Sequence, residues 1–414
     1  MADLLWPGDH RAGDHLSDAA AVRAALRVES AWLATLVDAR VAPEEAAVDV
    51  ARAIGTVDLE ALAAASEASG NPVIPLLGIV RERLSTRHPE SARWVHRGLT
   101  SQDVLDSALV LSLRDTVDAV LVEVDEQVRV LSDLADLHRG DAMVGRTLTQ
   151  HAVPITFGLK AAQWLHGILD TRDDLRHERE RLPIQVGGAA GTLAAPAELL
   201  RLSGSTADAS ALAHDLADRL GLRYSPPWHT SRAPVTRAAD ALVRATGAWG
   251  RIAADVLLLA RPEIAELAEP TVDGRGGSST MPQKANPVLS VLVRRAALSA
   301  PALAAQLHVA AASYVDERPD GAWHMEWSAL AQLGRRSLTA ASQTTELLAG
   351  LHVDTGRMAR LVQAAGSGLL AEQRSLAGLY DDPVTPHFDP THYLGSTDAI
   401  IDELVARARQ GGHP

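Results

Sequence analysis

The segment Gly274–Pro287 combines residue types that handle negative charge. It reads Gly-Arg-Gly-Gly-Ser-Ser-Thr-Met-Pro-Gln-Lys-Ala-Asn-Pro. Glycines, serines and a proline disfavour regular structure in its first half, which leaves backbone N–H groups free. Lys284 and Asn286 lie near the start of a predicted helix, and helix N-termini favour anions. The segment therefore predicts an anion-binding loop that carries a hydroxyl group. The competing interpretation is a solvated linker, which has no need of Lys, Asn and two prolines in this order.

Long helices must position this loop. The segment 103–137 contains neither Gly nor Pro, and its apolar residues recur at helical spacing. Thr100 followed by Asp103 resembles a capping box with Asp in place of Glu. Four more long helices are predicted at 154–181, 233–259, 286–314 (with a kink at Pro301) and 326–351, after shorter ones at 18–40, 43–53, 58–67 and 73–84.

Five long helices in series need partners for their apolar stripes, which favours a bundle completed by other subunits over a monomeric helical array. Aromatic residues make up only 3% of the chain, good helix formers are abundant, and no βαβ rhythm is visible. The sequence therefore predicts an all-α fold.

Composition also excludes several classes of function. A formal net charge of −13 argues against a general nucleic-acid or anionic-membrane surface. The absence of cysteine removes disulfides, thiolate nucleophiles and Cys-ligated metals. The N-terminus has no basic region followed by an apolar run, and we find no stretch of about 18 uncharged apolar residues. We therefore expect a soluble cytoplasmic protein.

The segment Gly277–Pro287 resembles the G-S-S-x-M-P-x-K-x-N-P signature of the fumarase/aspartase superfamily. Thr100–Asp103 resembles the first signature region of that family, and Gly145–Thr147 resembles the start of the second. The resemblance implies a homotetramer with a twenty-helix core, active sites shared by three subunits, and no cofactor or metal.

The same resemblance implies three helical domains: an N-terminal domain at 1–100, a central long-helix domain with the active-site loops at 101–351, and a C-terminal domain at 352–414. We expect the last to be shortened. After Ala371–Gln373 the family usually has a further helical hairpin, whereas this chain leads quickly to Asp389–Gly395.

Carried over by position, Ser278 is the catalytic base, and Lys284 and Asn286 bind and polarise a substrate carboxylate. A serine hydroxyl is a poor base unless preorganised donors stabilise its alkoxide. The loop N–H groups, the helix end and Lys284 would do so once the loop closes and water leaves. The aci-carboxylate formed by proton removal would meet Lys284 and Asn286.

Leu148 departs from the family pattern. Fumarases, argininosuccinate lyases and adenylosuccinate lyases carry a histidine here, which assists a poor leaving group. Leucine donates no proton, and a carboxylate leaving group needs none, because its conjugate acid has a pKa of about 4. This fits the bacterial 3-carboxy-cis,cis-muconate cycloisomerase branch, which the segments Gly145–Pro154, Gly187–Leu193, Pro227–Thr230 and Trp323–Trp327 also resemble.

A tricarboxylate substrate of that branch needs several donors. The candidate binding residues are Thr100, Ser101, Gln102, Arg146, Thr147, Gln150, His151, His229, Arg232, Ser279, Met281 and Arg318. Competing interpretations make His151 a cap or pairing residue and Arg97, Arg232 and Arg318 members of surface salt bridges. His324 is interpreted as a packing residue between two tryptophans. Ala285 removes a basic charge that many relatives carry near the loop.

Three alternative functions stay open. The first is another lyase of the superfamily with an acidic leaving group, such as nitrite from nitrosuccinate. The second is an argininosuccinate- or adenylosuccinate-type lyase in which His151 takes the acid role. The third is a catalytically silent structural tetramer, against which the intact set Ser278, Lys284 and Asn286 argues.

Overall fold

The computed structural model describes residues 3–270, 272, 274–277, 280–281, 284–318, 320–381 and 389–410. The chain is mostly helical, as predicted, with four short strands in the described part. It divides into two compact units. The first unit comprises Met1–Ala119, Leu175–Val243 and Ala300–Thr339, and the second comprises Val120–Asp174, Arg244–Ser299 and Ala340–Pro414. The three domains with boundaries at 100 and 351 stay a prediction.

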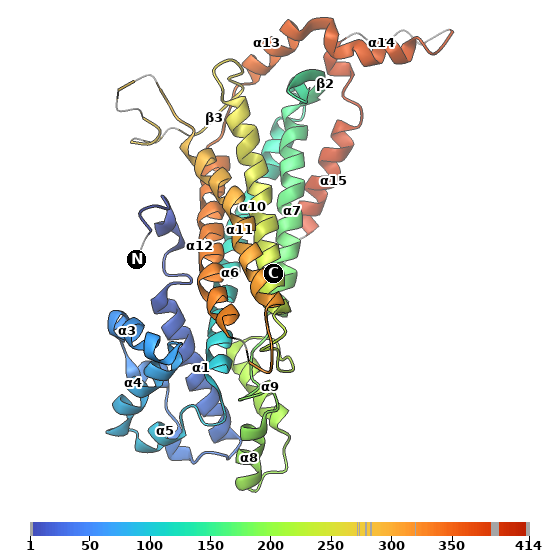
Figure 1. Cartoon of the computed structure of the whole chain (residues 1–414). Helices are drawn as coiled ribbons and strands as arrows, with labels where there is room; N and C mark the ends of the chain where they lie inside the picture. Colours follow the sequence, from blue (N-terminus) through green and yellow to red (C-terminus); the bar gives the residue numbers. More distant parts are fainter. Residues whose placement is uncertain are drawn as a thin grey trace. The chain divides into compact units, whose positions relative to one another are not determined.

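Five long helices carry the fold (Figure 1). They are α6 (Ser101–Leu137), α7 (Phe157–Arg181), α10 (Ala233–Leu259), α11 (Val288–Ala312) and α12 (Gly321–Ala349). Each matches a predicted helix, and α11 runs through Pro301. Asp103 caps α6 as predicted, since its carboxylate accepts from the Thr100 backbone N–H at 3.0 Å.

The first unit also contains short helices around α1 (Asp18–Asp38), whose Trp32, Leu33 and Leu36 are fully buried. These helices are η1 (Asp9–Ala12), η2 (Glu44–Ala46), α2 (Val50–Ile54), α3 (Leu59–Ser69), α4 (Val73–Ser85), α5 (Pro89–Trp94), α8 (Ala194–Leu202) and α9 (Ala209–Leu220). The single helix predicted at 43–53 is wrong. Its residues form η2 and α2, and between them the Asp49 side chain caps α2 by accepting from the Arg52 N–H.

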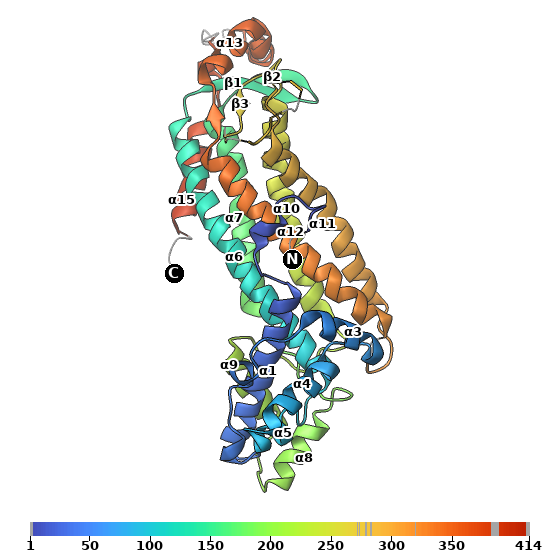
Figure 2. The same cartoon turned by 90° about the vertical axis from the view of Figure 1, so that its left-hand side faces the viewer.

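In the second unit, hydrogen bonds of one buried amide join α6, α10 and α12. Figure 2 shows the course of these three helices. Gln127 of α6 accepts from the Trp249 indole N–H at 2.8 Å and donates to the Ala341 carbonyl at 3.0 Å. Both side chains are fully buried, so these bonds satisfy polar atoms that water does not reach.

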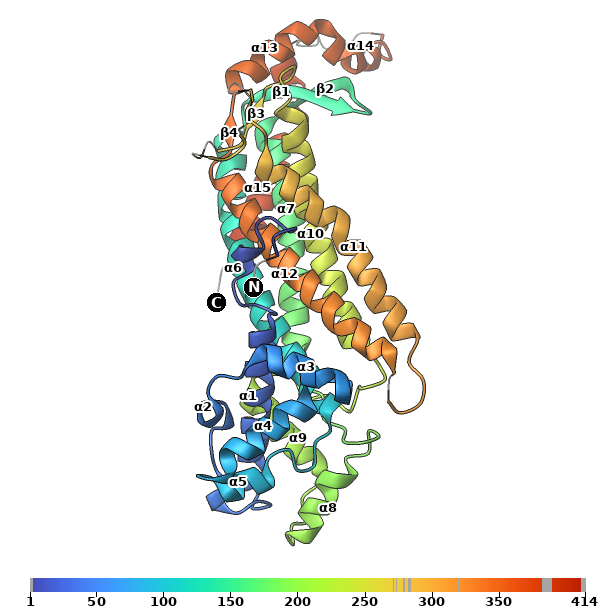
Figure 3. The ribbon, with the colours of Figure 1, turned by 60° about the vertical axis from the view of Figure 1, so that its left-hand side comes forward.

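A β-hairpin in the second unit corrects the prediction of a helix from 154. Strand β1 (Ala142–Thr147) pairs antiparallel with β2 (Gln150–Thr156), and α7 begins only at Phe157. Helix α13 (Thr355–Ala365) lies beside this hairpin (Figure 3). Val144 of β1 packs against Val362 of α13 and Leu369 of η3 (Gly366–Leu370). The remaining elements are β3 (Leu267–Ala268), β4 (His352–Val353), α14 (Ala371–Ala377), η4 (Pro390–His392) and α15 (Thr397–Gln410).

Helix α11 is long and apolar enough to cross a membrane by length and composition alone. Core helices of soluble proteins meet the same criterion, and Leu289, Val293, Ala296 and Leu307 of α11 are buried in the chain. Val291, Leu298 and Val309 of the same helix are exposed by 52%, 71% and 59%. The helix therefore has apolar surface left over after the chain has folded.

Gly250 of α10 sits where a side chain has no room. A Cβ built there would lie 2.4 Å from the Cβ of Ala297 on α11, within the second unit. Gly250→Ala should force the helices apart and lower the free energy of unfolding by about 1–3 kcal/mol. Gly247, three residues earlier on α10, faces open space in the chain.

Gly247→Ala is therefore the matched control and should raise stability by about 0.5–1 kcal/mol, because alanine loses less backbone entropy in a helix. Urea unfolding followed by circular dichroism would measure both. Equal effects of the two substitutions would contradict this account of the α10–α11 contact.

Candidate active site

The predicted site residues fall into one set in each unit. The first-unit set is Thr100, Ser101, Gln102, His229, Arg232 and Arg318. The second-unit set is Arg146, Thr147, Gln150, His151, Met281, Lys284 and Asn286. Ser278 and Ser279 lie outside the described residues.

The first-unit set is organised around Asp103, which the sequence indicated as a helix cap and as part of a signature region but not as a site residue. Its side chain is buried and accepts the backbone N–H groups of Gly187 at 2.8 Å and Gly188 at 3.0 Å. It also accepts from the Gln185 amide at 3.2 Å. Burial raises the pKa of Asp103 to about 6, and these donors oppose the rise. At neutral pH the carboxylate is therefore ionised, and it fixes the glycine-rich segment 187–192 against the start of α6.

His229 lies against that glycine-rich segment and is 7% exposed. A Cβ on Gly191 would be 2.6 Å from the His229 Cε1, and one on Gly187 would be 3.1 Å from its Nδ1. A side chain at Gly191 would collide with the ring, and one at Gly187 would crowd it. The carbonyl of His229 accepts from the Gln102 amide at 2.9 Å, so Gln102 holds the histidine's backbone. Burial lowers the pKa of His229, and the nearby Arg318 cation lowers it further.

Arg318 lies in the connection between α11 and α12 and is exposed. Its guanidinium donates to the Thr100 hydroxyl at 2.9 Å and to the Ala189 carbonyl at 2.9 Å. The structure thus brings three predicted residues, Thr100, His229 and Arg318, to the glycine-rich segment. Together they offer a cation, a hydroxyl and an imidazole on one patch of the first unit.

Arg232 does not join this patch as a free cation. It is 3% exposed and forms a two-nitrogen contact with Asp106 at 2.7 and 3.0 Å. It also donates to Glu326 at 2.6 Å, and the rings of Trp228 and Tyr314 cover its guanidinium. The prediction that Arg232 binds substrate is not supported by this geometry. The side chain instead joins α6, α10 and α12 of the first unit through buried charge.

His324 contacts both neighbouring tryptophans, as its interpretation as a packing residue requires. Its ring centroid lies 5.6 Å from that of Trp323 and 4.7 Å from that of Trp327. Its Nε2 also lies 2.7 Å from the Gly70 carbonyl. Trp323 in turn donates its indole N–H to Asp106 at 2.9 Å, which gives that carboxylate a further donor.

In the second unit, the β-hairpin places the predicted binding residues as cross-strand pairs. Arg146 lies opposite His151, and Thr147 lies opposite Gln150, so each pair shares a face. Arg146 donates to the fully buried carboxylate of Glu266 at 2.8 Å, which aims its guanidinium. A Cβ at Gly145 would lie 2.4 Å from the Val153 carbonyl, where the strand pairing is irregular.

The tip of the hairpin consists of Leu148 and Thr149, both with left-handed backbone angles (φ 48° and 69°). That conformation is costly for a bulky side chain. Leu148 is also 95% exposed in the single chain. The tip therefore holds an apolar side chain in water on a strained turn, next to Thr147 and Gln150.

The signature loop partly folds onto itself. Asn286 donates its backbone N–H and its side-chain amide to the Gly276 carbonyl, at 2.8 and 2.9 Å. The Lys284 side chain is exposed. Glu269 accepts from the N–H groups of Leu289 and Ser290 at 3.0 and 2.6 Å, so a side chain of the same unit already occupies the start of α11. The sequence predicted that this helix end attracts a substrate anion. In the structure, the carboxylate of Glu269 lies there instead.

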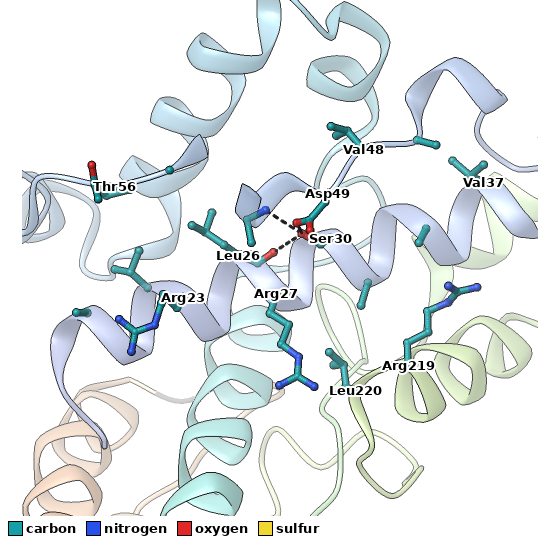
Figure 4. Close-up of a pocket in the computed structure, with 18 of the residues that line it drawn as sticks. Arg23, Leu26, Arg27, Ser30, Val37, Val48, Asp49, Thr56, Arg219 and Leu220 are labelled. Atoms are coloured by element: carbon teal, nitrogen blue, oxygen red, sulfur yellow. Dashed lines mark hydrogen bonds between the residues drawn. The ribbon is translucent and has the colours of Figure 1, made fainter. Parts of the chain in front are cut away.

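A large groove runs along α1 in the first unit. It has a volume of about 1320 Å³, and Arg23, Arg27, Ser30, Asp49 and Arg219 lie around it (Figure 4). None of the predicted site residues lines it.

Comparisons with known proteins show which family the chain belongs to and which fold it shares. A family model described as lyase matches residues 19–301. The chain is 41% identical to a nitrosuccinate lyase of Streptomyces davaonensis, over 91% of this chain and 90% of the relative. It is 37% identical to a 3-carboxy-cis,cis-muconate cycloisomerase of Bradyrhizobium diazoefficiens, over 92% and 91%. The crystal structure of 3-carboxy-cis,cis-muconate lactonizing enzyme from Pseudomonas putida superposes with a TM-score of 0.86 at 32% identity, covering 96% of this chain and 97% of that one.

The buried charges around Arg232 generate a stability prediction. Arg232→Met leaves Asp106 and Glu326 buried without their counter-ion and should lower the free energy of unfolding by about 3–5 kcal/mol. Burial already raises the pKa of Glu326 while Arg232 opposes the rise, so without that cation the folded-state pKa of Glu326 should lie further above its unfolded value. The folded variant then binds more protons than the unfolded chain, so its deficit should shrink as pH falls towards 5.

Arg129 on the same helix as Asp106 provides the control. It pairs with Glu126 and Asp133 while its side chain stays 60% exposed. Arg129→Met should leave the free energy of unfolding nearly unchanged at every pH, because an exposed ion pair contributes little to stability. Chemical denaturation of both variants at pH 5 and pH 8 makes the comparison, and a similar loss in the two would refute a special role for the buried pair.

Proposed function

Because the chain belongs to the lyase family, within the fumarase/aspartase superfamily, we propose that it is a cycloisomerase that converts 3-carboxy-cis,cis-muconate to 4-carboxymuconolactone. A carboxylate oxygen of the substrate adds to one carbon of a C=C bond, and Ser278 delivers a proton to the adjacent carbon. In the reverse direction the Ser278 alkoxide takes that α-proton as the lactone carboxylate departs. No cofactor enters this scheme, and we expect the enzyme in the cytoplasm.

The observation that carries the proposal is Leu148 at the tip of the hairpin. The related lyases that expel water or an amine use a histidine there to protonate the leaving group. Leu148 supplies no proton, which suits a leaving group that is already a stable anion, such as a carboxylate. His151, the residue that an argininosuccinate-type mechanism would recruit, lies opposite Arg146 one pair further from the tip.

The charges around the two sets suit a substrate with several carboxylates. Arg318 with Thr100 offers one binding patch in the first unit. Lys284 and Arg146 offer two cations in the second, where the pairing of Arg146 with Glu266 fixes its direction. In the proposed mechanism, Lys284 and Asn286 hold the carboxylate that becomes the aci-carboxylate, so the Asn286 amide has to leave the Gly276 carbonyl.

We propose that a homotetramer completes the site by combining loops from three subunits. Two features of the chain support this. The predicted site residues are divided between two units, and α11 exposes Val291, Leu298 and Val309, apolar side chains that a second copy would bury. Leu148 on the hairpin tip would be buried in the same way.

A second function has specific support. Nitrosuccinate elimination expels nitrite, also a weakly basic anion, so Leu148 is compatible with it. The relative from Streptomyces davaonensis, named for this reaction, is 41% identical to the chain. Both reactions use the same base and carboxylate contacts and differ in the shape of the substrate beyond the reacting carbons.

The two functions separate in parallel assays of the purified protein. We expect absorbance loss with 3-carboxy-cis,cis-muconate, with kcat/KM in the range of ordinary enzymes, about 10⁴ M⁻¹s⁻¹ or more. Release of fumarate and nitrite from nitrosuccinate should be slower by at least tenfold. The reverse ranking would replace the proposed function with the second one, and turnover of argininosuccinate or adenylosuccinate alone would exclude both.

The role of Ser278 has its own test. Ser278→Ala removes the proposed base and should lower kcat about 10²–10⁴-fold with a smaller change in KM. Ser85→Ala is the control, because Ser85 is an exposed residue at the end of α4 that bonds only to its own turn among the described residues. Full activity of the Ser278→Ala enzyme would show that the mechanism is wrong even where the substrate is right.

A further inference from the structure

We propose that Glu269 and Glu346 are positioning residues of the reaction: their carboxylates fix the two stems of the signature loop (274–287), so that the loop meets the substrate carboxylate from a rigid base. The entering stem consists of the described residues of 266–277, and the leaving stem is 284–290. The proposal rests on the proposed function for the identity of the substrate. Its structural part concerns the second unit alone.

The entering stem is fastened to the chain that leaves α12. Its strand β3 pairs with β4, which follows shortly after the end of that helix. The Asp354 N–H donates to the Glu266 carbonyl at 3.0 Å, which extends this pairing by one residue. A Cβ built on Gly350 would lie 2.5 Å from the Cβ of Pro270, so the proline ring lies directly against the backbone of that glycine. The stem is therefore held both at its strand and at its proline.

Further along the same stem, Arg275 forms an ion pair with Glu346 on the last turn of α12. The Arg275 Nη2 lies 2.5 Å from the Glu346 Oε1, and the two side chains are 21% and 31% exposed. Water and salt screen this pair less than a surface pair such as Arg129 with Glu126, whose side chains are 60% and 41% exposed. The Glu346 carbonyl also accepts from the Gly350 N–H at 3.3 Å, so the ion pair and the proline contact lie one helical turn apart.

Glu269 joins the entering stem to the leaving stem. Its two carboxylate oxygens accept from the N–H groups of Leu289 and Ser290 at 3.0 and 2.6 Å. These N–H groups belong to the first turn of α11, where the helix offers them no acceptor and where its N-terminus favours a negative charge. Glu269 lies 20 residues before Leu289 in the chain, so one side chain sets the distance between the two stems.

The two stems also contact each other at Gly276. Its carbonyl accepts both the backbone N–H and the side-chain amide of Asn286, at 2.8 and 2.9 Å. Gly276 has a φ of 73°, and a Cβ there would lie 2.6 Å from the Asn286 carbonyl oxygen, so this contact requires glycine. Under the proposed function the side-chain amide leaves Gly276 to bind the substrate, while the backbone bond remains. Glu269 and Glu346 then hold the stems during this exchange.

The fixed stems matter most in the transition state. Lys284 and Asn286 have to meet negative charge that develops only as the proton is transferred, and a misplacement of about 1 Å can cost about 10²-fold in rate. Loosened stems should therefore lower kcat more than they raise KM. Neither Glu269 nor Glu346 needs to contact the substrate for this effect, which makes both of them positioning residues.

The contact of Glu269 is tested without any substrate. Glu269→Gln replaces one carboxylate oxygen by an NH₂ group, which cannot accept from an N–H. Hydrogen–deuterium exchange with mass spectrometry should show about tenfold faster exchange in the peptide that covers Leu289 and Ser290, with α13 unchanged. Glu263→Gln is the matched control, because Glu263 is an exposed residue of the same connection between α10 and α11. Equal exchange in the two variants would overturn the role of Glu269, whichever reaction the enzyme catalyses.

The ion pair is tested by exchanging its charges. Arg275→Glu and Glu346→Arg each place two like charges together and should lower kcat about 10- to 100-fold, with KM changed less than about threefold. The enzyme that carries both substitutions has an ion pair again and should recover most of the loss. Glu346→Gln keeps the shape of the side chain and removes only its charge. It should lower kcat about tenfold while the midpoint of urea unfolding changes little.

Two kinetic results would refute the positioning role. A doubly substituted enzyme as impaired as Arg275→Glu would mean that the arginine acts directly on the substrate, and a raised KM with unchanged kcat in Glu346→Gln would place Glu346 in substrate binding. The assays use whichever of the two proposed substrates is turned over. If neither is, hydrogen exchange decides, because the Arg275 N–H donates to the Val272 carbonyl at 3.0 Å. Its exchange should be faster in Glu346→Gln, and unchanged exchange would overturn the proposal.

Discussion

Asp103 is buried and charged, and the local structure of the first unit follows from satisfying it. Water does not reach the carboxylate, so every acceptor position must be filled by the protein. The chain supplies the N–H of Thr100 from the start of α6, the N–H groups of Gly187 and Gly188, and the Gln185 amide. One side chain thereby ties two distant segments together, and the Thr100 hydroxyl and the glycine-rich segment become neighbours as a result.

The buried cluster of Arg232, Asp106 and Glu326 imposes a second constraint, because these charges must also be paired inside the protein. Two carboxylates, from α6 and α12, face the guanidinium of Arg232 just before α10, and Trp323 and Tyr314 donate to the same two carboxylates. Such a cluster contributes little net stability compared with apolar packing, but it penalises any arrangement in which a charge loses its partner. It fixes the relative positions of three long helices at the end where the binding patch lies.

The second unit positions its reactive groups differently, on a strained turn and a loop. Pairing with Glu266 aims Arg146, while the left-handed backbone of Leu148 and Thr149 holds an apolar tip in solvent. Asn286 bonds its own loop through Gly276. Under the proposed function, a ligand at the loop exchanges this hydrogen bond for another, and other subunits complete the site.

The sequence by itself determined the long helices and the family. Segments with helical apolar spacing and few Gly or Pro residues favour helices, and the loop from Gly274 to Pro287 is recognisable because it matches the superfamily signature. The β-hairpin escaped prediction because its turn, Leu148–Thr149, lacks the glycine or asparagine that usually marks one. The role of Arg232 escaped for another reason: its partners Asp106 and Glu326 lie 126 and 94 positions away. Only the tertiary structure decided that Arg232 is buried, that Asp103 is an anchor and that His229 faces Gln185, because burial and partner geometry arise from segments that meet only after folding.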